Sequence, residues 1–280
     1  MQTPILEVSN LSLRYPGASE PAVRDVSFTL GRERLGIVGE SGSGKSTVGR
    51  ALMRLLPQAD LSADVMRFED VDLLRASERQ MLKVRGARMS MILQDPKFSL
   101  NPIRRCGDQV AEAYRTHVRC TKAEARAKAI AMLDAVQIRD PERVFEFYPH
   151  EVSGGMGQRI MIAMMLLTDP QLVIADEPTS ALDVTVRLQV LKILDDLVRE
   201  RGIGLVMISH DLNLVRNFCD RVLIMYAGRV VETLQADALD QARHPYTRGL
   251  LAAQPRIGGD RTALPVLDRD PAWLTSETHS

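Results

Sequence analysis

The sequence contains Gly39-Glu40-Ser41-Gly42-Ser43-Gly44-Lys45-Ser46-Thr47, which fits the pattern GxxxxGK[ST]. The residues before it, Arg34-Leu35-Gly36-Ile37-Val38, form a short apolar run typical of a buried strand, and residues 47–56 are compatible with a helix. A strand, a glycine-rich loop and a helix in this order are the context that the pattern requires. We therefore predict a loop that binds phosphate groups.

The chemistry of such a loop follows from its residue types. Glycines let the backbone turn its amides inward, and the following helix directs the positive end of its dipole at the same anion. Lys45 is expected to reach the β and γ phosphates of a nucleotide, and the Ser46 hydroxyl to bind Mg²⁺. The alternative is a glycine-rich turn without a ligand, and the Lys-Ser pair at the required spacing argues against it.

A pair of acidic residues supplies a second candidate element. Asp176 and Glu177 follow the apolar run Leu172-Val173-Ile174, at the expected carboxyl end of a buried strand, where open α/β sheets place their ligands. Asp176 suits a magnesium ligand, either bound directly or through a coordinated water, and Glu177 could accept a proton from the water that attacks the γ phosphate. Because an acidic pair at a strand end is usually just solvated, this interpretation depends on the phosphate loop.

Composition restricts the class of protein. The chain has 280 residues, of which 45% are hydrophobic and 26% charged, as expected of one compound globular domain. The 36 Lys and Arg residues balance the 36 Asp and Glu residues. A formal net charge of zero argues against the broad basic field that a nucleic-acid binder needs, so we expect no nucleic-acid partner.

The same sequence indicates a compartment. The amino terminus lacks the basic and apolar regions of a secretory signal, and the longest apolar run, residues 160–167, is too short to cross a bilayer. Cys106, Cys120 and Cys219 form no CxxC pair, and we expect free thiols in a reducing compartment. Any association with a membrane is expected to come through partners.

Apolar strand-like runs alternate with helical stretches, as in an α/β fold with a mainly parallel sheet. Two runs with a two-residue period near the amino terminus predict an antiparallel edge region. Residues 95–167 are mostly helical and predict an inserted subdomain, in which Thr121-Lys122-Ala123-Glu124 forms a capping box. Hydrophobic periodicity ends at Pro255. The predicted strands are residues 6–14, 23–30, 34–38, 171–175, 204–209 and 221–226, and residues 184–201 are a predicted helix.

A third motif, Val152-Ser153-Gly154-Gly155-Met156-Gly157-Gln158, shortly precedes the acidic pair. With it, residues 6–255 resemble the nucleotide-binding subunits of ABC transporters, whose signature is LSGGQ. The resemblance implies a P-loop NTPase (RecA-like) α/β core with an antiparallel β subdomain and an inserted α-helical subdomain. It also implies a cassette over residues 1–254, with its helical subdomain at about 95–167, and a short extension over 255–280. Val152 and Met156 depart from the signature, so a side-chain contact from position 156 is in doubt.

The resemblance also assigns roles to single residues. Tyr15 is similar to the aromatic residue that stacks on adenine, Gln94 to a glutamine that contacts Mg²⁺ and the attacking water, and His210 to a histidine that contacts the γ phosphate. Ser180-Ala181-Leu182-Asp183 resembles the D-loop, although alone it indicates a helix start capped by serine. The implied catalytic residues are Lys45, Gln94, Glu177 and His210, and the implied metal ligands are Ser46, Gln94 and Asp176. The implied nucleotide-binding residues are Tyr15, Gly39, Glu40, Ser41, Gly42, Ser43, Gly44, Lys45, Ser46, Thr47, Ser153, Gly154 and Gly155, of which the last three act on the nucleotide of a second subunit.

Two carboxyl-terminal motifs suggest a branch of this family. Residues 226–232 and His244-Pro245-Tyr246-Thr247-Arg248-Gly249-Leu250-Leu251 resemble the dipeptide, oligopeptide and nickel importer ATPases. Residues 252–280 contain no cysteine, so the iron-sulfur cluster of many peptide-importing relatives is not expected. This favours the nickel or metallophore relatives slightly and leaves peptide importers open. His244 is expected to serve in packing rather than as a metal ligand.

The implied function is hydrolysis of ATP, with Mg²⁺, to energise uptake of a small solute, peptide or nickel/metallophore. The implied partners are a second ABC ATPase subunit, with a heterodimer ahead of a homodimer, two membrane permease subunits and, through them, an extracytoplasmic solute-binding protein. The expected location is peripheral, at the cytoplasmic face of the inner membrane. The alternatives are a soluble ABC ATPase of translation or DNA repair, against which the absence of tandem cassettes or a coiled coil argues, and an exporter ATPase.

Overall fold

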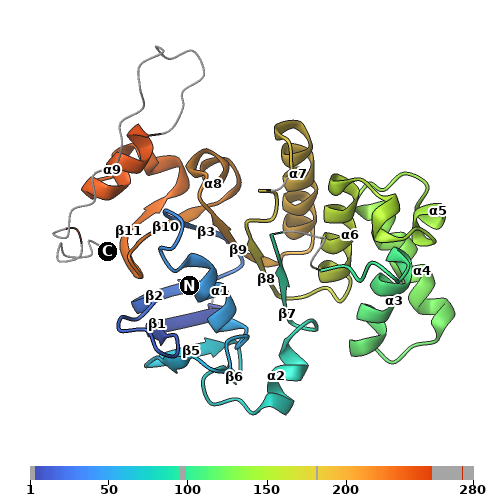
Figure 1. Ribbon diagram of the computed structural model, residues 1–280, viewed down its shortest axis with the longest axis horizontal. Coiled ribbons are helices and arrows are strands. Elements are labelled where there is room, and N and C mark those ends of the chain that lie inside the picture. Colours follow the sequence, from blue (N-terminus) through green and yellow to red (C-terminus); the bar gives the residue numbers. More distant parts are fainter. Residues whose placement is uncertain (1–3, 95–98, 181, 254–272, 274–280) are drawn as a thin grey trace. The chain divides into compact units, whose positions relative to one another are not determined.

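The structure is a computed structural model that describes residues 4–94, 99–180, 182–253 and Trp273 (Figure 1). The chain divides into two compact units, residues 1–75 with 206–280 and residues 76–205. Apart from Trp273, the predicted extension over 255–280 lies outside the described residues. Among the residues described, no helix is long and apolar enough to cross a membrane.

The first unit contains an antiparallel sheet with the strand order β2-β1-β5-β6, and β4 pairs with β1. Buried and exposed residues alternate along β1 and β2, and these two strands pair antiparallel with Leu6 opposite Leu30. The predicted antiparallel region is therefore confirmed with its bounds. The strands are β1 (Leu6–Arg14), β2 (Val23–Leu30), β4 (Asp60–Ser62), β5 (Val65–Phe68) and β6 (Val71–Asp72).

A second sheet in this unit has β11, β10, β3 and β9 as successive neighbours. β3 is parallel to β10, with Leu35 opposite Arg221, and four of its five residues are buried. The buried strand therefore delivers the chain directly into the glycine-rich loop. The elements are β3 (Arg34–Val38), α1 (Lys45–Leu52), β9 (Gly204–Ser209), α8 (Leu212–Phe218), β10 (Arg221–Tyr226), β11 (Arg229–Gln235), the 3-10 helix η3 (Ala236–Gln241) and α9 (Pro245–Ala252).

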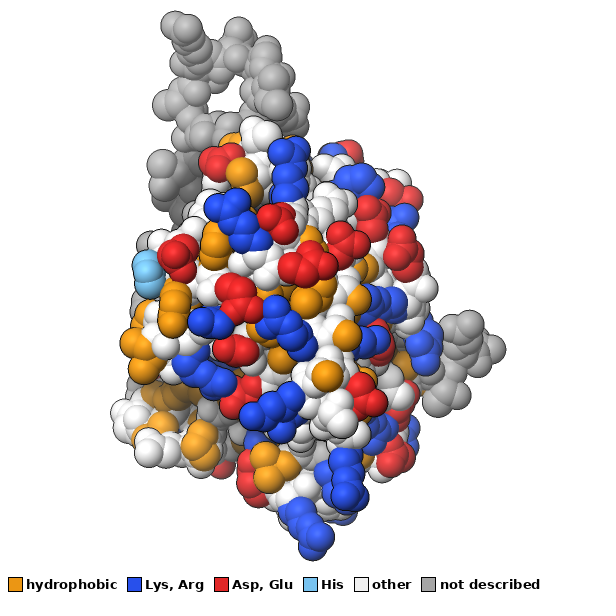
Figure 2. Space-filling view, turned by 90° about the vertical axis from the view of Figure 1, so that its right-hand side faces the viewer, with side chains coloured by type: hydrophobic (Ala, Val, Ile, Leu, Met, Phe, Trp, Pro, Cys, Tyr) orange, Lys and Arg blue, Asp and Glu red, His pale blue; other side chains and the backbone are white. Residues whose placement is uncertain are grey.

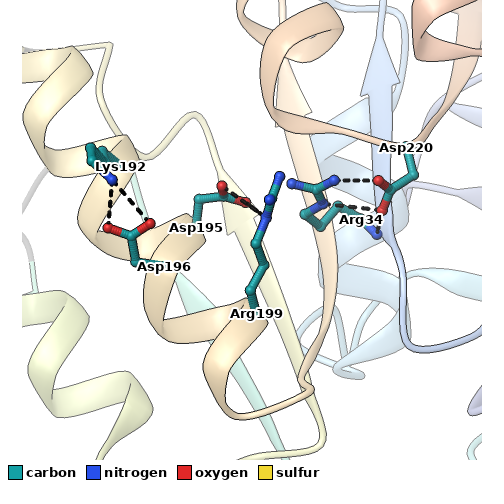
Figure 3. Close-up of polar contacts among 6 residues, drawn as sticks. All are labelled: Arg34, Lys192, Asp195, Asp196, Arg199 and Asp220. Atoms are coloured by element: carbon teal, nitrogen blue, oxygen red, sulfur yellow. Dashed lines mark hydrogen bonds and ion pairs between the residues drawn. The ribbon is translucent and has the colours of Figure 1, made fainter.

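An ion pair fixes the start of β3 against the start of β10 (Figure 3). The Asp220 carboxylate accepts hydrogen bonds from the Arg34 amide at 2.9 Å and from Arg34 Nε at 3.1 Å, and its second oxygen pairs with Arg34 Nη2. The Asp220 amide donates in return to the Arg34 carbonyl at 2.8 Å. This two-pronged contact sets the register of the two strands whose carboxyl ends reach the phosphate loop.

The second unit combines two parallel strands with a group of helices. β7 pairs with β8, and α3 packs against α4 and α6. The face in Figure 2 carries side chains of both charges, interspersed, with no broad field of one sign. The elements are α2 (Glu78–Val84), β7 (Met89–Ile92), α3 (Cys106–His117), α4 (Lys122–Ala135), α5 (Pro141–Phe145), the 3-10 helix η2 (Pro149–Glu151), α6 (Gly154–Leu166), β8 (Leu172–Asp176) and α7 (Val184–Glu200).

Helix starts follow local capping chemistry. The predicted capping box of α4 is confirmed, because the Thr121 hydroxyl accepts from the Glu124 amide at 3.2 Å and Glu124 accepts from the Thr121 amide at 2.7 Å. At α7, Asp183 is the N-cap and accepts from the amides of Thr185 and Val186, both at 3.1 Å. The alternative in which Ser180 caps this helix is therefore wrong, since the carboxylate of Asp183 reaches both amides.

Two other helix bounds differ slightly from the prediction. α1 begins at Lys45 because Gly44, with φ of 98°, turns the chain directly into the helix. It ends at Leu52, before the predicted Leu56, because Arg54 adopts a left-handed conformation with φ of 50°. α7 ends at Glu200, and its outer surface carries the pairs Lys192–Asp196 and Asp195–Arg199, each spanning one turn (Figure 3).

The register contact predicts an asymmetry between two ion pairs of the first unit. Asp220→Ala removes the carboxylate that accepts from the Arg34 amide and from the Arg34 side chain, which is only 14% exposed. We expect this change to lower the free energy of unfolding by about 2 kcal/mol. Asp240→Ala breaks the pair with Arg216, in which Asp240 is 76% exposed, and we expect a loss below about 1 kcal/mol. Urea unfolding of the two variants measures the difference, and equal losses would contradict this account of the register.

Candidate functional site

The glycine-rich loop folds into a turn that only glycine permits at two points. A Cβ on Gly39 would lie 2.1 Å from the Met225 carbonyl oxygen, and a Cβ on Gly44 would lie 2.5 Å from the Ala22 carbonyl oxygen. Gly44 also has a φ of 98°, in the region that glycine adopts without steric cost. The backbone of the loop is thus pressed against two neighbouring segments of the same unit.

Lys45 lies folded into this loop and is only 5% exposed. Its ammonium group donates to the carbonyl oxygens of Gly39 at 2.8 Å and Glu40 at 2.7 Å, and to the Ser43 hydroxyl at 3.4 Å. No side-chain oxygen caps the first turn of α1, so its amides and the helix dipole add to the positive charge of the lysine. A buried cation at the amino-terminal end of a helix is an arrangement that suits an anion.

Further contacts hold the loop in place. The Gly228 amide donates to the Ser43 carbonyl at 3.0 Å, and the Gly228 carbonyl accepts from the Arg24 amide at 2.8 Å. The Glu40 amide donates to the Tyr246 hydroxyl of α9 at 3.0 Å. Sequence reasoning assigned Tyr246 only to a branch motif and missed this contact, because no local pattern links residues so far apart in the chain.

Two other predicted residues belong to the same unit. Tyr15 follows β1, and its hydroxyl lies 3.1 Å from the Thr47 hydroxyl while its side chain stays 36% exposed. The structure thus brings Tyr15 to the end of the phosphate loop. His210 follows β9 directly and is exposed, whereas the next residue, Asp211, caps α8 by accepting from the Leu214 amide at 3.1 Å.

The acidic pair belongs to the second unit. β7 and β8 run parallel with Ile92 opposite Ala175, so Gln94, which lies just after β7, and the pair Asp176–Glu177, at the end of β8, lie at the same carboxyl end of these strands. Asp176 is only 4% exposed, and Glu177 has a left-handed backbone with φ of 47°. A non-glycine residue in this region is uncommon, and such strain is found preferentially at functional sites.

The signature-like motif forms the start of α6 in the same unit. Ser153 is the N-cap, and its hydroxyl accepts from the Met156 amide at 3.3 Å. Ser153 and Gly154 are exposed, whereas Met156 is half-buried. The hydroxyl, the exposed backbone and the amino-terminal end of the helix suit an incoming anion.

The predicted site residues therefore form two groups. The phosphate loop, Tyr15 and His210 belong to the first unit, and Gln94, the signature-like motif and the acidic pair belong to the second. Within the described ranges, no group of three or more His, Cys, Asp or Glu side chains could hold a metal ion. His244 is buried, and its Nδ1 accepts from the Tyr246 amide at 3.2 Å, which confirms the packing role.

Comparison with known proteins shows the family of the chain. The chain belongs to the ABC transporter family, whose sequence pattern matches residues 23–180. Members of this family carry ATP-binding cassettes that hydrolyse ATP, so the chain is an ATP hydrolase that powers transport.

Curated relatives match the chain along most of its length. It is 45% identical to the probable D,D-dipeptide transport ATP-binding protein DdpD of Escherichia coli (strain K12), over all of this chain and 86% of the relative. It is also 45% identical to the oligopeptide transport ATP-binding protein OppD of Salmonella typhimurium, over 96% of this chain and 82% of the relative. Both relatives are named as transport ATP-binding proteins.

Solved structures agree on the fold. The cbiO1 subunit of Clostridium perfringens, part of an ABC transporter complex, is similar with a TM-score of 0.75 and 25% identity, over 86% of this chain and 92% of that one. A dimeric ATP-binding cassette in a post-hydrolysis state, bound to ADP and Pi, is similar with a TM-score of 0.72 and 25% identity, over 82% of this chain and 98% of that one. The α/β P-loop NTPase fold predicted from the sequence is confirmed.

The Ser153 cap of α6 leads to a prediction about stability that involves no nucleotide. Ser153→Ala removes the hydroxyl that accepts from the Met156 amide, and we expect a loss of about 1 kcal/mol of stability. Ser153→Asn keeps a side-chain acceptor at the N-cap, and we expect it to be within a few tenths of a kcal/mol of the parent. Thermal unfolding measures both variants, and an equal loss of stability in the two would show that the hydroxyl is not the cap.

Proposed function

We propose that this chain is the ATP-hydrolysing subunit of an ABC importer that takes up peptides. The observation that carries the proposal is the buried Lys45, folded into a glycine-rich loop at the start of a helix whose first turn has no side-chain cap. A lysine, inward amides and a helix dipole together neutralise the charge of a bound triphosphate. Hydrolysis then depends mainly on positioning and on stabilisation of the transferred phosphoryl group.

In this proposal four residues act in catalysis. Lys45 exchanges its contacts with loop carbonyls for the β and γ phosphates of ATP. Glu177 accepts a proton from the attacking water, which is the role that a carboxylate with a fixed, strained backbone can perform. His210 contacts the γ phosphate and orients Glu177, and Gln94 contacts the water.

Magnesium fits the donors that these residues offer. The Ser46 hydroxyl, the Asp176 carboxylate and the Gln94 amide oxygen are hard oxygen ligands, and Mg²⁺ takes such ligands together with phosphate and water oxygens. Asp176 is 4% exposed, so a cation would relieve the cost of burying its charge. We propose that these residues hold Mg²⁺, which would share the charge of the triphosphate.

The remaining residues bind the nucleotide. Tyr15 is 36% exposed, with its hydroxyl near that of Thr47, and we propose that its ring stacks on adenine. The other nucleotide contacts come from the backbone and hydroxyl groups of residues 39–47. Ser153, Gly154 and Gly155 act on the nucleotide of a second ATPase subunit, through a hydroxyl and backbone amides, so the change from glutamine to Met156 in the signature leaves this role intact.

A single cassette implies partners. We propose a complex of two ATPase subunits, a heterodimer ahead of a homodimer, on two membrane permeases that receive solute from an extracytoplasmic binding protein. The cassette extends over residues 1–254, with its helical subdomain at about 95–167, and 255–280 is an extension. The chain is peripheral on the cytoplasmic side of the inner membrane. Its similarity to dipeptide and oligopeptide transport ATP-binding proteins supports peptide as the solute, ahead of nickel or a metallophore.

Transport by the assembled complex tests this proposal. In proteoliposomes that hold the permeases, both ATPase subunits and the binding protein, we expect ATP-dependent uptake of a labelled dipeptide or oligopeptide. Glu177→Gln should lower ATP turnover by about 10²- to 10⁴-fold, the usual contribution of a general base, while ATP binding persists. Uptake should fall in parallel.

A surface variant provides the control. Glu200→Gln changes the same side-chain type at the exposed end of α7, and it should leave turnover and uptake at parental values. Normal turnover of Glu177→Gln would refute the assignment of the base. Uptake of Ni²⁺ without peptide would refute the proposed solute, and export would refute the direction of transport.

A further inference from the structure

The carboxyl-terminal helix of the first unit reaches the phosphate loop through one side chain. Tyr246 is fully buried, and its hydroxyl accepts the hydrogen bond from the Glu40 amide at 3.0 Å. Glu40 is the second residue of the loop, after Gly39 and before Gly42, Gly44 and the start of α1. The bond therefore anchors the entry of the loop.

The position of Tyr246 is itself fixed on several sides. Glu232 of β11 accepts from the amides of Arg243 and His244, at 2.7 and 3.3 Å, and thereby holds the start of α9. His244 then accepts the Tyr246 amide through Nδ1, which requires a neutral ring nitrogen. Burial lowers the pKa of His244, and this outweighs the raising effects of Glu232 and of a Trp273 backbone hydrogen bond.

Three aromatic rings meet at this place, and we call Tyr226, Tyr246 and Trp273 the aromatic cluster. The rings of Tyr226 and Tyr246 have centroids 4.6 Å apart, and the Trp273 indole lies 5.6 Å from the first and 5.8 Å from the second. Such tilted and edge-on pairs are the favoured arrangements of aromatic rings. Tyr226 also directly follows Met225, whose carbonyl oxygen closely approaches Gly39.

We propose that Tyr246 is a positioning residue for the phosphate loop and that it couples Trp273 to nucleotide binding. The proposal rests on the proposed ATP site, since Tyr246 would position the same loop that binds the nucleotide. A nucleotide that orders the loop acts on the Glu40–Tyr246 bond and hence on the rings packed against Tyr246. By thermodynamic reciprocity, a change at Trp273 alters the affinity of the loop for nucleotide.

The sequence offers a direct probe, because Trp273 is the single tryptophan of the chain. We expect saturation of the full-length chain with MgATP to change the intensity or wavelength of its emission. Tyr246→Phe keeps the ring and removes the hydroxyl that accepts from the Glu40 amide. We expect it to raise the Kd for MgATP about 3- to 10-fold, the effect of one lost hydrogen bond, and to abolish most of the emission change.

Tyr226→Phe is the matched control, because it changes the same residue type within the aromatic cluster and leaves the hydroxyl at Glu40 in place. It should keep both the affinity and the emission change. Equilibrium dialysis with labelled ATP measures affinity without using tryptophan, so a failure of ATP binding by the parent chain refutes the proposed function rather than the coupling. Circular dichroism shows whether each variant folds.

Two results would overturn the proposal. One is a parent chain that binds MgATP by dialysis without any change in Trp273 emission, and this test needs no variant to fold. The other is a folded Tyr246→Phe variant with the affinity and emission change of the parent.

Discussion

The close approach of three backbone segments at the phosphate loop is the constraint on which the rest of the site depends. At Gly39 and Gly44 a Cβ atom would overlap the carbonyl oxygens of Met225 and Ala22, at 2.1 and 2.5 Å. Only residues without side chains at these points allow the backbone to turn so tightly against its neighbours. Because this turn encloses the Lys45 side chain, water screens its charge little, and the charge can act strongly on a bound anion.

The segments that hold the loop come from distant parts of the sequence. β3 leads into the loop, and its register against β10 is set by the contact between Arg34 and Asp220. β10 in turn brings Met225 to the loop, the turn after β10 brings Gly228, and α9 brings Tyr246. Long-range contacts of this kind make the shape of the phosphate loop a property of the whole first unit. A chain of zero net charge can thus hold a strongly positive site.

Much of this could be predicted from the sequence, because local patterns determine it. Alternation of apolar and polar residues gave β1 and β2 their bounds, and Thr121 with Glu124 marked the start of α4. Short strands such as β4 and β6 escaped prediction, because two or three residues carry no readable period. The serine at position 180 resembled a cap, yet Asp183 lies closer to the first amides of α7.

In the candidate site too, some features follow from local sequence patterns and others only from packing. The phosphate loop, the acidic pair and the signature-like motif are each one continuous stretch of sequence, so residue types and spacing were sufficient to find them. The bond between Glu40 and Tyr246 joins two residues that only the packing of α9 brings together. The left-handed backbone of Glu177 is likewise set by its surroundings, since glutamate has no preference for that conformation.

The central claim is that the phosphate loop is held in its binding shape before a nucleotide arrives. Amide hydrogen exchange of residues 40–47, measured with and without MgATP, tests it most directly. The account predicts that the Glu40 amide, bonded to Tyr246, exchanges at least about tenfold more slowly than an unprotected amide even without nucleotide, and that the amides of residues 44–47 gain protection when MgATP binds. Unprotected exchange of the Glu40 amide in the nucleotide-free chain would contradict it.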